Sequence, residues 1–153
     1  MDDKLDEIDR RILKALQKDA SLSVDMLAET VSLSRNACWR RMKNLEANGV
    51  IKQRVAIVDP MAVGLGLTVF VLVRTSHHDK EWLDVFDRAV RELPEIMGAH
   101  RMSGDLDYIL RVRVGSVQDY DKFYQRLISR VPLSDISASF VMDDIKDTTQ
   151  LPI

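Results

Sequence analysis

Apolar residues in the first third of the chain recur with the period of an α-helix. Near the N-terminus they are spaced three and four residues apart, as Leu5, Ile8, Ile12 and Leu16, which predicts a helix with one apolar face. Ser23 is a residue type that caps helices, and a second apolar stripe follows it: Leu27, Ala28 and Val31. A short turn leads to a third helical pattern, so this region is predicted to form a helix-turn-helix domain.

The third predicted helix has marked ends and two different faces. Ser34 is a natural N-cap, and Gly49 suits the left-handed position that follows a helix. The inner face carries Cys38, Met42 and Leu45 at spacings of four and three residues, so these side chains should pack together. The remaining residues are largely polar or cationic, and they include Arg35, Asn36, Arg40 and Lys43. We predict that this second face meets DNA.

The rest of the chain alternates strand and helix patterns. Runs rich in β-branched and aromatic residues predict strands at 67–74, 96–102, 108–114 and 136–142, with helical patterns at 80–93 and 117–131. The order βαββαβ is that of a ferredoxin-like domain, a four-stranded antiparallel sheet with two helices on one face. Because residues 67–74 are apolar almost throughout, both faces of this strand should be covered. We therefore expect the second face of the sheet to meet another subunit.

The segment between these two patterns marks a domain boundary. Residues 50–58 are rich in β-branched side chains and predict a short wing or hinge strand. Asp59-Pro60 follows, and the missing proline N–H should interrupt pairing there. We predict an α+β protein with an N-terminal helix-turn-helix (winged-helix-like) domain at residues 1–59 and a C-terminal ferredoxin-like domain with an antiparallel sheet at residues 60–153.

The two predicted domains differ in their net charge. The chain has 22 lysines and arginines against 24 acidic residues and a pI near 5.9, which argues against a protein that coats nucleic acid through general basicity. Residues before Asp59 nevertheless carry more basic than acidic side chains, and the remainder is acidic. A single cysteine excludes an internal disulfide. With no signal-peptide pattern and no apolar run long enough to span a bilayer, we expect a cytoplasmic protein without membrane contact.

Two motifs at this separation resemble a known family. The first comprises Ser34, Cys38, Arg41, Leu45, Glu46, Gly49 and Ile51, followed by Asp59-Pro60; the second is Ser103-Gly104-Asp105-Leu106-Asp107-Tyr108. Together with the predicted fold order, they resemble the Lrp/AsnC family of prokaryotic transcription regulators over essentially the whole chain. The resemblance implies homodimers that commonly assemble into tetramers or octamers through the second domain. It also implies a small ligand, usually an amino acid, bound between those domains.

Two details qualify the resemblance. The chain departs from the family at Arg35-Asn36-Ala37, where many members have a proline on either side of a small polar residue. We therefore expect its preferred DNA sequence to differ. Two segments resemble a branch of the family that includes cysteine-responsive regulators: His77-His78 with Glu81-Trp82, and residues 148–153. This resemblance makes cysteine one candidate effector.

The predicted DNA-binding residues differ in the part of DNA that they fit. An arginine fork such as Arg40 fits guanine, and the amide of Asn36 fits adenine, whereas Arg41 and Lys43 should hold the phosphate backbone. The full predicted set is Ser34, Arg35, Asn36, Trp39, Arg40, Arg41, Lys43 and Arg54. Trp39 either approaches the DNA or packs between helix and wing, and Arg54 either contacts a phosphate or faces solvent. The alternative for the whole set is a solvated helix face.

The second motif predicts a place for the effector. Asp107 is suited to receive an ammonium group, and backbone N–H groups near Gly104 are suited to a carboxylate, a pairing that fits a free amino acid. The alternative is a plain β-turn, which glycine and aspartate also favour. Flanking residues and positions that border the family's ligand site complete the predicted set: Arg101, Met102, Ser103, Gly104, Asp105, Leu106, Asp107, Tyr108, Val117, Ser137, Ser139 and Val141.

Reactive chemistry is not expected. Cys38 lies on the inner stripe, where a thiol behaves as a small hydrophobe with a raised pKa. His77-His78 are adjacent and no Cys/His spacing completes a metal site, so neither metal nor cofactor is predicted. An enzyme is disfavoured because Asp105 and Asp107 lack a nucleophile or metal partner nearby.

The sequence thus predicts a sequence-specific, homo-oligomeric and nucleoid-associated transcription regulator. It binds double-stranded DNA, and its assembly or DNA binding responds to an amino acid. The alternative is an architectural DNA-binding protein without an effector.

Overall fold

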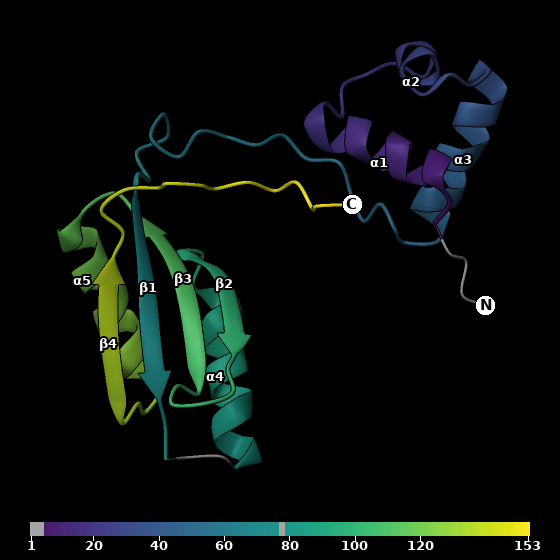
Figure 1. The fold of residues 1–153 in the computed structure, drawn as a ribbon. Coiled ribbons are helices and arrows are strands. Elements are labelled where there is room, and N and C mark those ends of the chain that lie inside the picture. The colour runs from purple at the N-terminus through teal and green to yellow at the C-terminus, as the bar shows by residue number, and fades with distance from the viewer. Residues whose placement is uncertain (1–4, 77–78) are drawn as a thin grey trace. The chain divides into compact units, whose positions relative to one another are not determined.

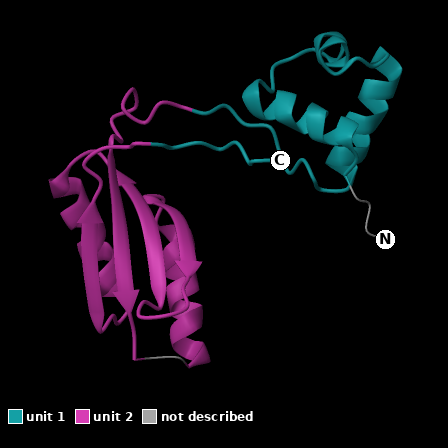
Figure 2. Ribbon diagram, viewed as in Figure 1, with its two compact units in different colours: residues 1–57, 146–153 teal, residues 58–145 magenta. Residues whose placement is uncertain are grey.

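The computed structural model describes residues 5–76 and 79–153, which form two compact units (Figure 2). The helical unit comprises Met1–Ile57 together with Lys146–Ile153, and the sheet unit comprises Val58–Ile145. No helix among the described residues is long and apolar enough to cross a membrane. Each unit has its own hydrophobic core, so each is described by itself.

The helical unit contains α1 (Glu7–Lys18), α2 (Val24–Val31) and α3 (Arg35–Ala47) (Figure 1). Side-chain caps begin all three helices. Asp6 and Asp9 form a reciprocal capping box on α1, Ser23 Oγ accepts a hydrogen bond from Met26 N, and Ser34 Oγ accepts one from Ala37 N. These caps satisfy N–H groups that have no partner inside a helix. The three predicted helices are confirmed.

The core of the helical unit fixes which face of α3 points outward. Cys38, Met42 and Leu45 are buried against α1 and α2, in a cluster that includes Ile12 and Leu27. Burial raises the pKa of the Cys38 thiol, because the charged thiolate loses its hydration in an apolar environment. The inner stripe is therefore packing, as predicted, and the polar face of α3 turns away from the core.

The predicted strand at residues 50–58 is wrong for this structure. Gly49 closes α3 with φ +71°, its N–H donating to Glu46 O at 3.0 Å. The N–H of Ile51 donates to Leu45 O, also at 3.0 Å, and the chain then continues in irregular conformation through Asp59. A β-branched segment becomes a strand only when another strand accepts its hydrogen bonds, and no strand of the described chain pairs with residues 50–58.

The sheet unit has the predicted βαββαβ order. It comprises β1 (Leu67–Arg74), α4 (Lys80–Glu92), β2 (Ile96–Arg101), β3 (Tyr108–Val114), α5 (Val117–Arg130) and β4 (Asp135–Phe140). The four strands lie in the order β2-β3-β1-β4 and all pairs are antiparallel. Both helices lie on the same side of this sheet (Figure 1). The ferredoxin-like fold class is thus confirmed.

The two faces of β1 have different surroundings. Val69, Val71 and Val73 are fully buried beneath the helices. Phe70 and Leu72 point to the opposite face, where they are half-buried and where neither α4 nor α5 lies (Figure 1). Apolar side chains at the centre of this face are what the predicted contact with a second subunit would bury.

The C-terminal tail contacts the helical unit, although the predicted boundary grouped it with the second domain. The Gln17 side chain donates through Nε2 to Leu151 O at 3.3 Å and accepts from Leu151 N at 2.6 Å. Ile153 packs against the core cluster of the three helices. A side-chain amide that satisfies both backbone groups of one residue holds the tail as a neighbouring strand would.

Truncation of the tail should destabilise the helical unit. Removing residues 151–153 eliminates the partial burial of Ile153 and both hydrogen bonds to Gln17, so we expect a loss of about 1 to 2 kcal/mol in the free energy of unfolding. Thermal unfolding followed by circular dichroism measures it. Leu151→Ala is the matched control, because the Leu151 side chain is exposed and its backbone bonds survive. Equal melting temperatures for wild-type and truncated protein would contradict the tail's role.

Candidate DNA-binding surface and effector turn

Asn36, Arg40 and Lys43 lie on one exposed stripe of α3, at helical spacings of four and three residues. Trp39 flanks this stripe with 52% of its surface exposed. One alternative for Trp39 was packing between the helix and a wing. The structure offers no wing for it to pack against, because residues 50–58 form no strand. Among the described residues, neither Asn36 nor Arg40 has a side-chain hydrogen bond or ion pair, so both are available to a ligand.

Arg41 has a different position from its neighbour Arg40. Its Nη1 lies 2.7 Å from Asp6 Oδ2 and 2.8 Å from Asp9 Oδ1, which joins the middle of α3 to the start of α1. The N–H of Asp9 and the Arg41 guanidinium both donate to Asp6, and these bonds hold the pKa of Asp6 below its ordinary value. The predicted phosphate contact of Arg41 would compete with two carboxylates.

The other predicted cations are also paired. Arg35 lies 3.0 Å from Asp25, and both side chains are mostly exposed. Glu46 accepts from Lys43 at 2.8 Å and from Arg54 at 3.0 Å, and these contacts, chiefly that of Lys43, lower the pKa of Glu46. Exposed pairs of this kind contribute little to stability. Ser34, the remaining member of the predicted set, serves as the N-cap.

Residues 102–107 form a tight turn between β2 and β3. Met102 N donates to Asp107 O at 2.8 Å, which closes the turn, and Gly104 adopts φ +107°. Only glycine adopts this backbone conformation without strain. Ser103, Gly104 and Asp105 are exposed, whereas Leu106 and Asp107 are half-buried. The motif therefore presents its backbone to solvent at the end of the sheet.

Asp107 is fixed by both its backbone and its side chain. Its N–H donates to Val73 O at 3.0 Å, and its Oδ2 accepts from Thr75 N at 2.8 Å. In the described structure no hydrogen bond reaches Oδ1. One carboxylate oxygen thus orients the group while the other keeps acceptor capacity, which is the arrangement that an ammonium group needs.

The predicted effector residues fall at opposite ends of the sheet. Arg101 and the turn lie where β2 meets β3, whereas Val117 begins α5 beyond the far end of β3. Val141, whose N–H donates to Thr68 O, is also at that far end. Seven residues of strand separate the two ends by roughly 20 Å. Within one copy of the chain these residues do not line a common cavity.

Ser137, Ser139 and Tyr108 take three other positions. Ser137 pairs in register with Leu72, and Ser139 with Phe70, so both exposed hydroxyls lie on the face without helices. Tyr108 is buried on the opposite, helix-covered face, with its ring centroid 4.6 Å from that of Phe86. Because Tyr108 directly follows the turn, its packing in the aromatic core holds that end of the turn in place.

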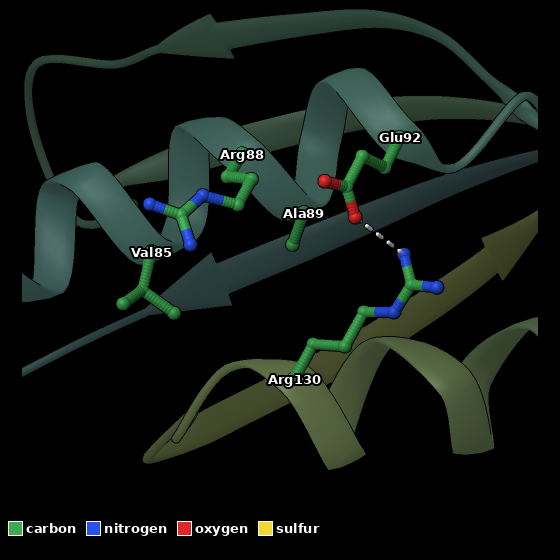
Figure 3. A pocket seen from close by; sticks show the side chains of 5 residues that line it. All are labelled: Val85, Arg88, Ala89, Glu92 and Arg130. Carbon is green, nitrogen blue, oxygen red and sulfur yellow. Dashed lines mark hydrogen bonds and ion pairs between the residues drawn. The ribbon is translucent and has the colours of Figure 1, made fainter.

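A cleft lies elsewhere, between α4 and α5, with a volume of about 250 Å³ (Figure 3). Val85 and Ala89 line it together with Arg88, Glu92 and Arg130. The guanidinium of Arg130 lies 3.4 Å from Glu92. None of the predicted effector residues contributes to this cleft.

Residues 5–76 and 79–153 contain no group of three or more His, Cys, Asp or Glu side chains that could hold a metal ion. The adjacent pair His77-His78 lies outside the described residues.

Sequence models of known families cover most of the chain. Residues 5–52 match a winged helix-turn-helix DNA-binding domain, and residues 68–151 match an Lrp/AsnC ligand binding domain. The DNA-binding transcriptional activator DecR of Escherichia coli is 50% identical over 150 residues, which cover 97% of this chain and 99% of DecR. The chain belongs to the Lrp/AsnC family.

Solved structures of Lrp/AsnC proteins agree with this assignment. An AsnC family transcriptional regulator from Agrobacterium tumefaciens is 48% identical with a TM-score of 0.93, covering 96% of both chains. A transcriptional regulator from Neisseria meningitidis, solved in complex with L-methionine, is 35% identical with a TM-score of 0.93, covering 97% of both chains. The protein is a DNA-binding transcription regulator of Lrp/AsnC type. This is a non-enzymatic role, as predicted.

The sequence prediction missed three residues that shape the turn. Thr75 binds the Asp107 carboxylate through its backbone, and Arg74 donates to Asp105 O at 2.9 Å while pairing with Asp135. A cation at the end of an apolar strand was the available signal for Arg74. Nothing in the local pattern indicates its partners, which lie 31 and 61 residues away in sequence.

Removing the Arg40 guanidinium should weaken DNA binding without affecting the fold. We expect Arg40→Ala to lower affinity roughly tenfold or more for DNA that the wild type selects from a random library, because a base-reading arginine is lost. Arg10→Ala, at an exposed position of α1, is the matched control. Fluorescence anisotropy with labelled duplexes measures the affinity, and equal affinities for both variants would contradict a DNA contact by Arg40.

Arg41→Met should instead lower the stability of the helical unit. The variant keeps the aliphatic stem but leaves Asp6 and Asp9 without their cation, so the melting temperature should fall by a few degrees at neutral pH. Because pairing lowers the pKa of Asp6 below 3.8, the stabilisation is complete above that pH and disappears as the pH falls through the lowered pKa. The melting temperatures of wild type and variant should therefore converge in acid, and a difference that persists there would refute the assignment.

Proposed function

We propose that this protein is a transcription regulator whose assembly on DNA responds to a free amino acid bound at the Gly104–Asp107 turn. The observation that carries the proposal is the state of Asp107, whose Oδ2 is held by Thr75 N while its Oδ1 receives no hydrogen bond from the described residues. The oriented carboxylate lies next to exposed backbone around Gly104. An ammonium group and a carboxylate on one carbon atom fit these two neighbours.

The solved relatives support the ligand class. The Neisseria regulator was solved in complex with L-methionine, and so was a feast or famine regulatory protein of Mycobacterium tuberculosis that is 26% identical. We propose the same class, an α-amino acid, for this chain. The sequence resemblance adds cysteine to the candidates.

We further propose that the effector site is shared between copies of the chain. The predicted residues lie at opposite ends of one sheet, so a single cavity containing all of them requires a second copy. The apolar centre of the helix-free face, Phe70 and Leu72, supports association of sheets into a homodimer, with tetramers or octamers built from it. The resulting oligomer would act on the chromosome, in the cytoplasm.

Regulation in this proposal is indirect. An amino acid that binds one oligomeric arrangement more tightly than another shifts the balance between them by its differential affinity alone. A changed arrangement alters the spacing between the α3 helices of different copies. Paired sites on DNA then match one arrangement better than the other, because their spacing is fixed by the helical repeat of DNA.

One experiment tests ligand and assembly together. Each of the twenty amino acids is titrated into the protein by calorimetry, and the same samples are examined for DNA binding and for size by light scattering. At least one amino acid should bind and change either DNA affinity or oligomer size. An effector-independent architectural protein would bind none of them and would discriminate little between DNA sequences.

Asp107→Asn should weaken effector binding while keeping the fold. The asparagine oxygen can still accept from Thr75 N, but the charge that attracts the ammonium is gone, and a charged hydrogen bond is lost. We expect affinity for the amino acid to fall at least about tenfold, with DNA binding in its absence unchanged. Asp121→Asn is the control, since it also removes one exposed carboxylate but lies on α5, outside the predicted effector set. An unchanged titration for Asp107→Asn would reject Asp107 as the ammonium partner.

A further inference from the structure

Arg74, the last residue of β1, connects the turn to two strands. Its Nε donates to the backbone oxygen of Asp105 at 2.9 Å, and its Nη1 lies 2.9 Å from Asp135 Oδ2 at the start of β4. A guanidinium is planar and rigid, so its donors fix the relative positions of the groups that accept from them. One side chain therefore ties the turn between β2 and β3 to the opposite edge of the sheet.

The contact with Asp105 holds a part of the turn that backbone bonds leave free. Met102 N donates to Asp107 O, and Asp107 N donates to Val73 O of β1, which fixes both ends of the turn. Between them, across residues 103–106 of the described structure, the bond from Arg74 is the one hydrogen bond to the rest of the protein. Gly104 lies in this stretch, and glycine has the largest conformational freedom of any residue. Without Arg74 the middle of the turn would sample many conformations.

We propose that Arg74 is a positioning residue for the effector. By holding the Asp105 carbonyl, it keeps the neighbouring N–H groups in the arrangement that receives the ligand carboxylate. Ordering a flexible segment at the moment of binding lowers affinity, whereas a segment ordered in advance avoids that cost. This inference rests on the proposed function, because it assumes that an amino acid binds at the turn.

The exposure of the ion pair separates this role from a contribution to folding. The side chains of Arg74 and Asp135 are 51% and 58% exposed, and pairs so open to water stabilise a fold very little. Loss of Arg74 should therefore change the turn and its ligand affinity while the melting temperature stays nearly constant. A residue that served only the fold would change both together.

The test compares four variants with the wild type. Arg74→Met keeps the length of the side chain but removes every donor, and Arg74→Lys offers a single ammonium in place of the fork. Asp135→Asn removes the ion pair but leaves the donation to Asp105. Arg91→Met is the matched control, because Arg91 forms a similar exposed pair with Asp87 at 2.7 Å on α4, away from the turn.

The ligand is whichever of the twenty amino acids binds the wild type most tightly. Its dissociation constant is measured for each full-length variant, together with the melting temperature. Amide hydrogen exchange of residues 103–106 is measured without ligand. Arg74→Met should weaken binding about threefold to tenfold, with a less favourable binding entropy. Exchange at residues 103–106 should accelerate. Arg74→Lys and Asp135→Asn should show smaller changes in both, and Arg91→Met none.

The outcomes separate the two proposals. If the wild type binds none of the twenty amino acids, the proposed function fails, and the role of Arg74 in affinity fails with it. If the wild type binds but Arg74→Met binds equally well, or exchanges its amides no faster, the role of Arg74 alone is overturned. A fall in melting temperature that accompanies the affinity loss and exceeds that of Arg91→Met would also overturn it, in favour of a role in folding.

Discussion

The sheet unit depends on the pairing of β1 with a neighbour on each side. Because β3 and β4 both pair with it, the register of β1 determines how far each of them is shifted along the sheet. The position of β2 then follows from its pairing with β3. Val73 lies opposite Tyr108, which brings Asp107 beside the end of β1, where Val73 O and Thr75 N hold it. A slip of one residue would turn the buried valines outward and carry the carboxylate away from its donors. The pairing of β1 thus determines both the packing of the core and the position of the Asp107 carboxylate.

In the helical unit, α3 is held against the other helices on one side and is exposed to solvent on the other. Arg40 and Arg41 show how adjacent residues divide this work. About 100° of rotation separates them on α3, and that rotation points Arg41 at the carboxylates of α1 while Arg40 stays open to solvent. The charge of the surface cannot be inferred by counting cations, since several are engaged within the protein.

Local features of the fold could be predicted from sequence, and long-range polar contacts could not. Helical periodicity and the caps at Ser23 and Ser34 placed all three N-terminal helices, because these signals act within four residues. The predicted strand at 50–58 was wrong because a run of β-branched residues indicates a preference for extended backbone without supplying a strand to pair with. For the candidate site, the glycine turn was evident, but its support by Arg74 was not, because Asp135 is 61 residues away. The contact of Gln17 with Leu151 spans 134 residues.

The two tryptophans give the protein a built-in pair of optical probes. Trp39 stands exposed on α3, whereas Trp82 is buried in the sheet unit, stacked on Phe86 with its indole N–H donating to Pro132 O. A water-soluble quencher reaches the first and is kept from the second. The natural emission of the chain therefore contains separate signals from the exposed face of α3 and from the core of the sheet unit, without any attached dye.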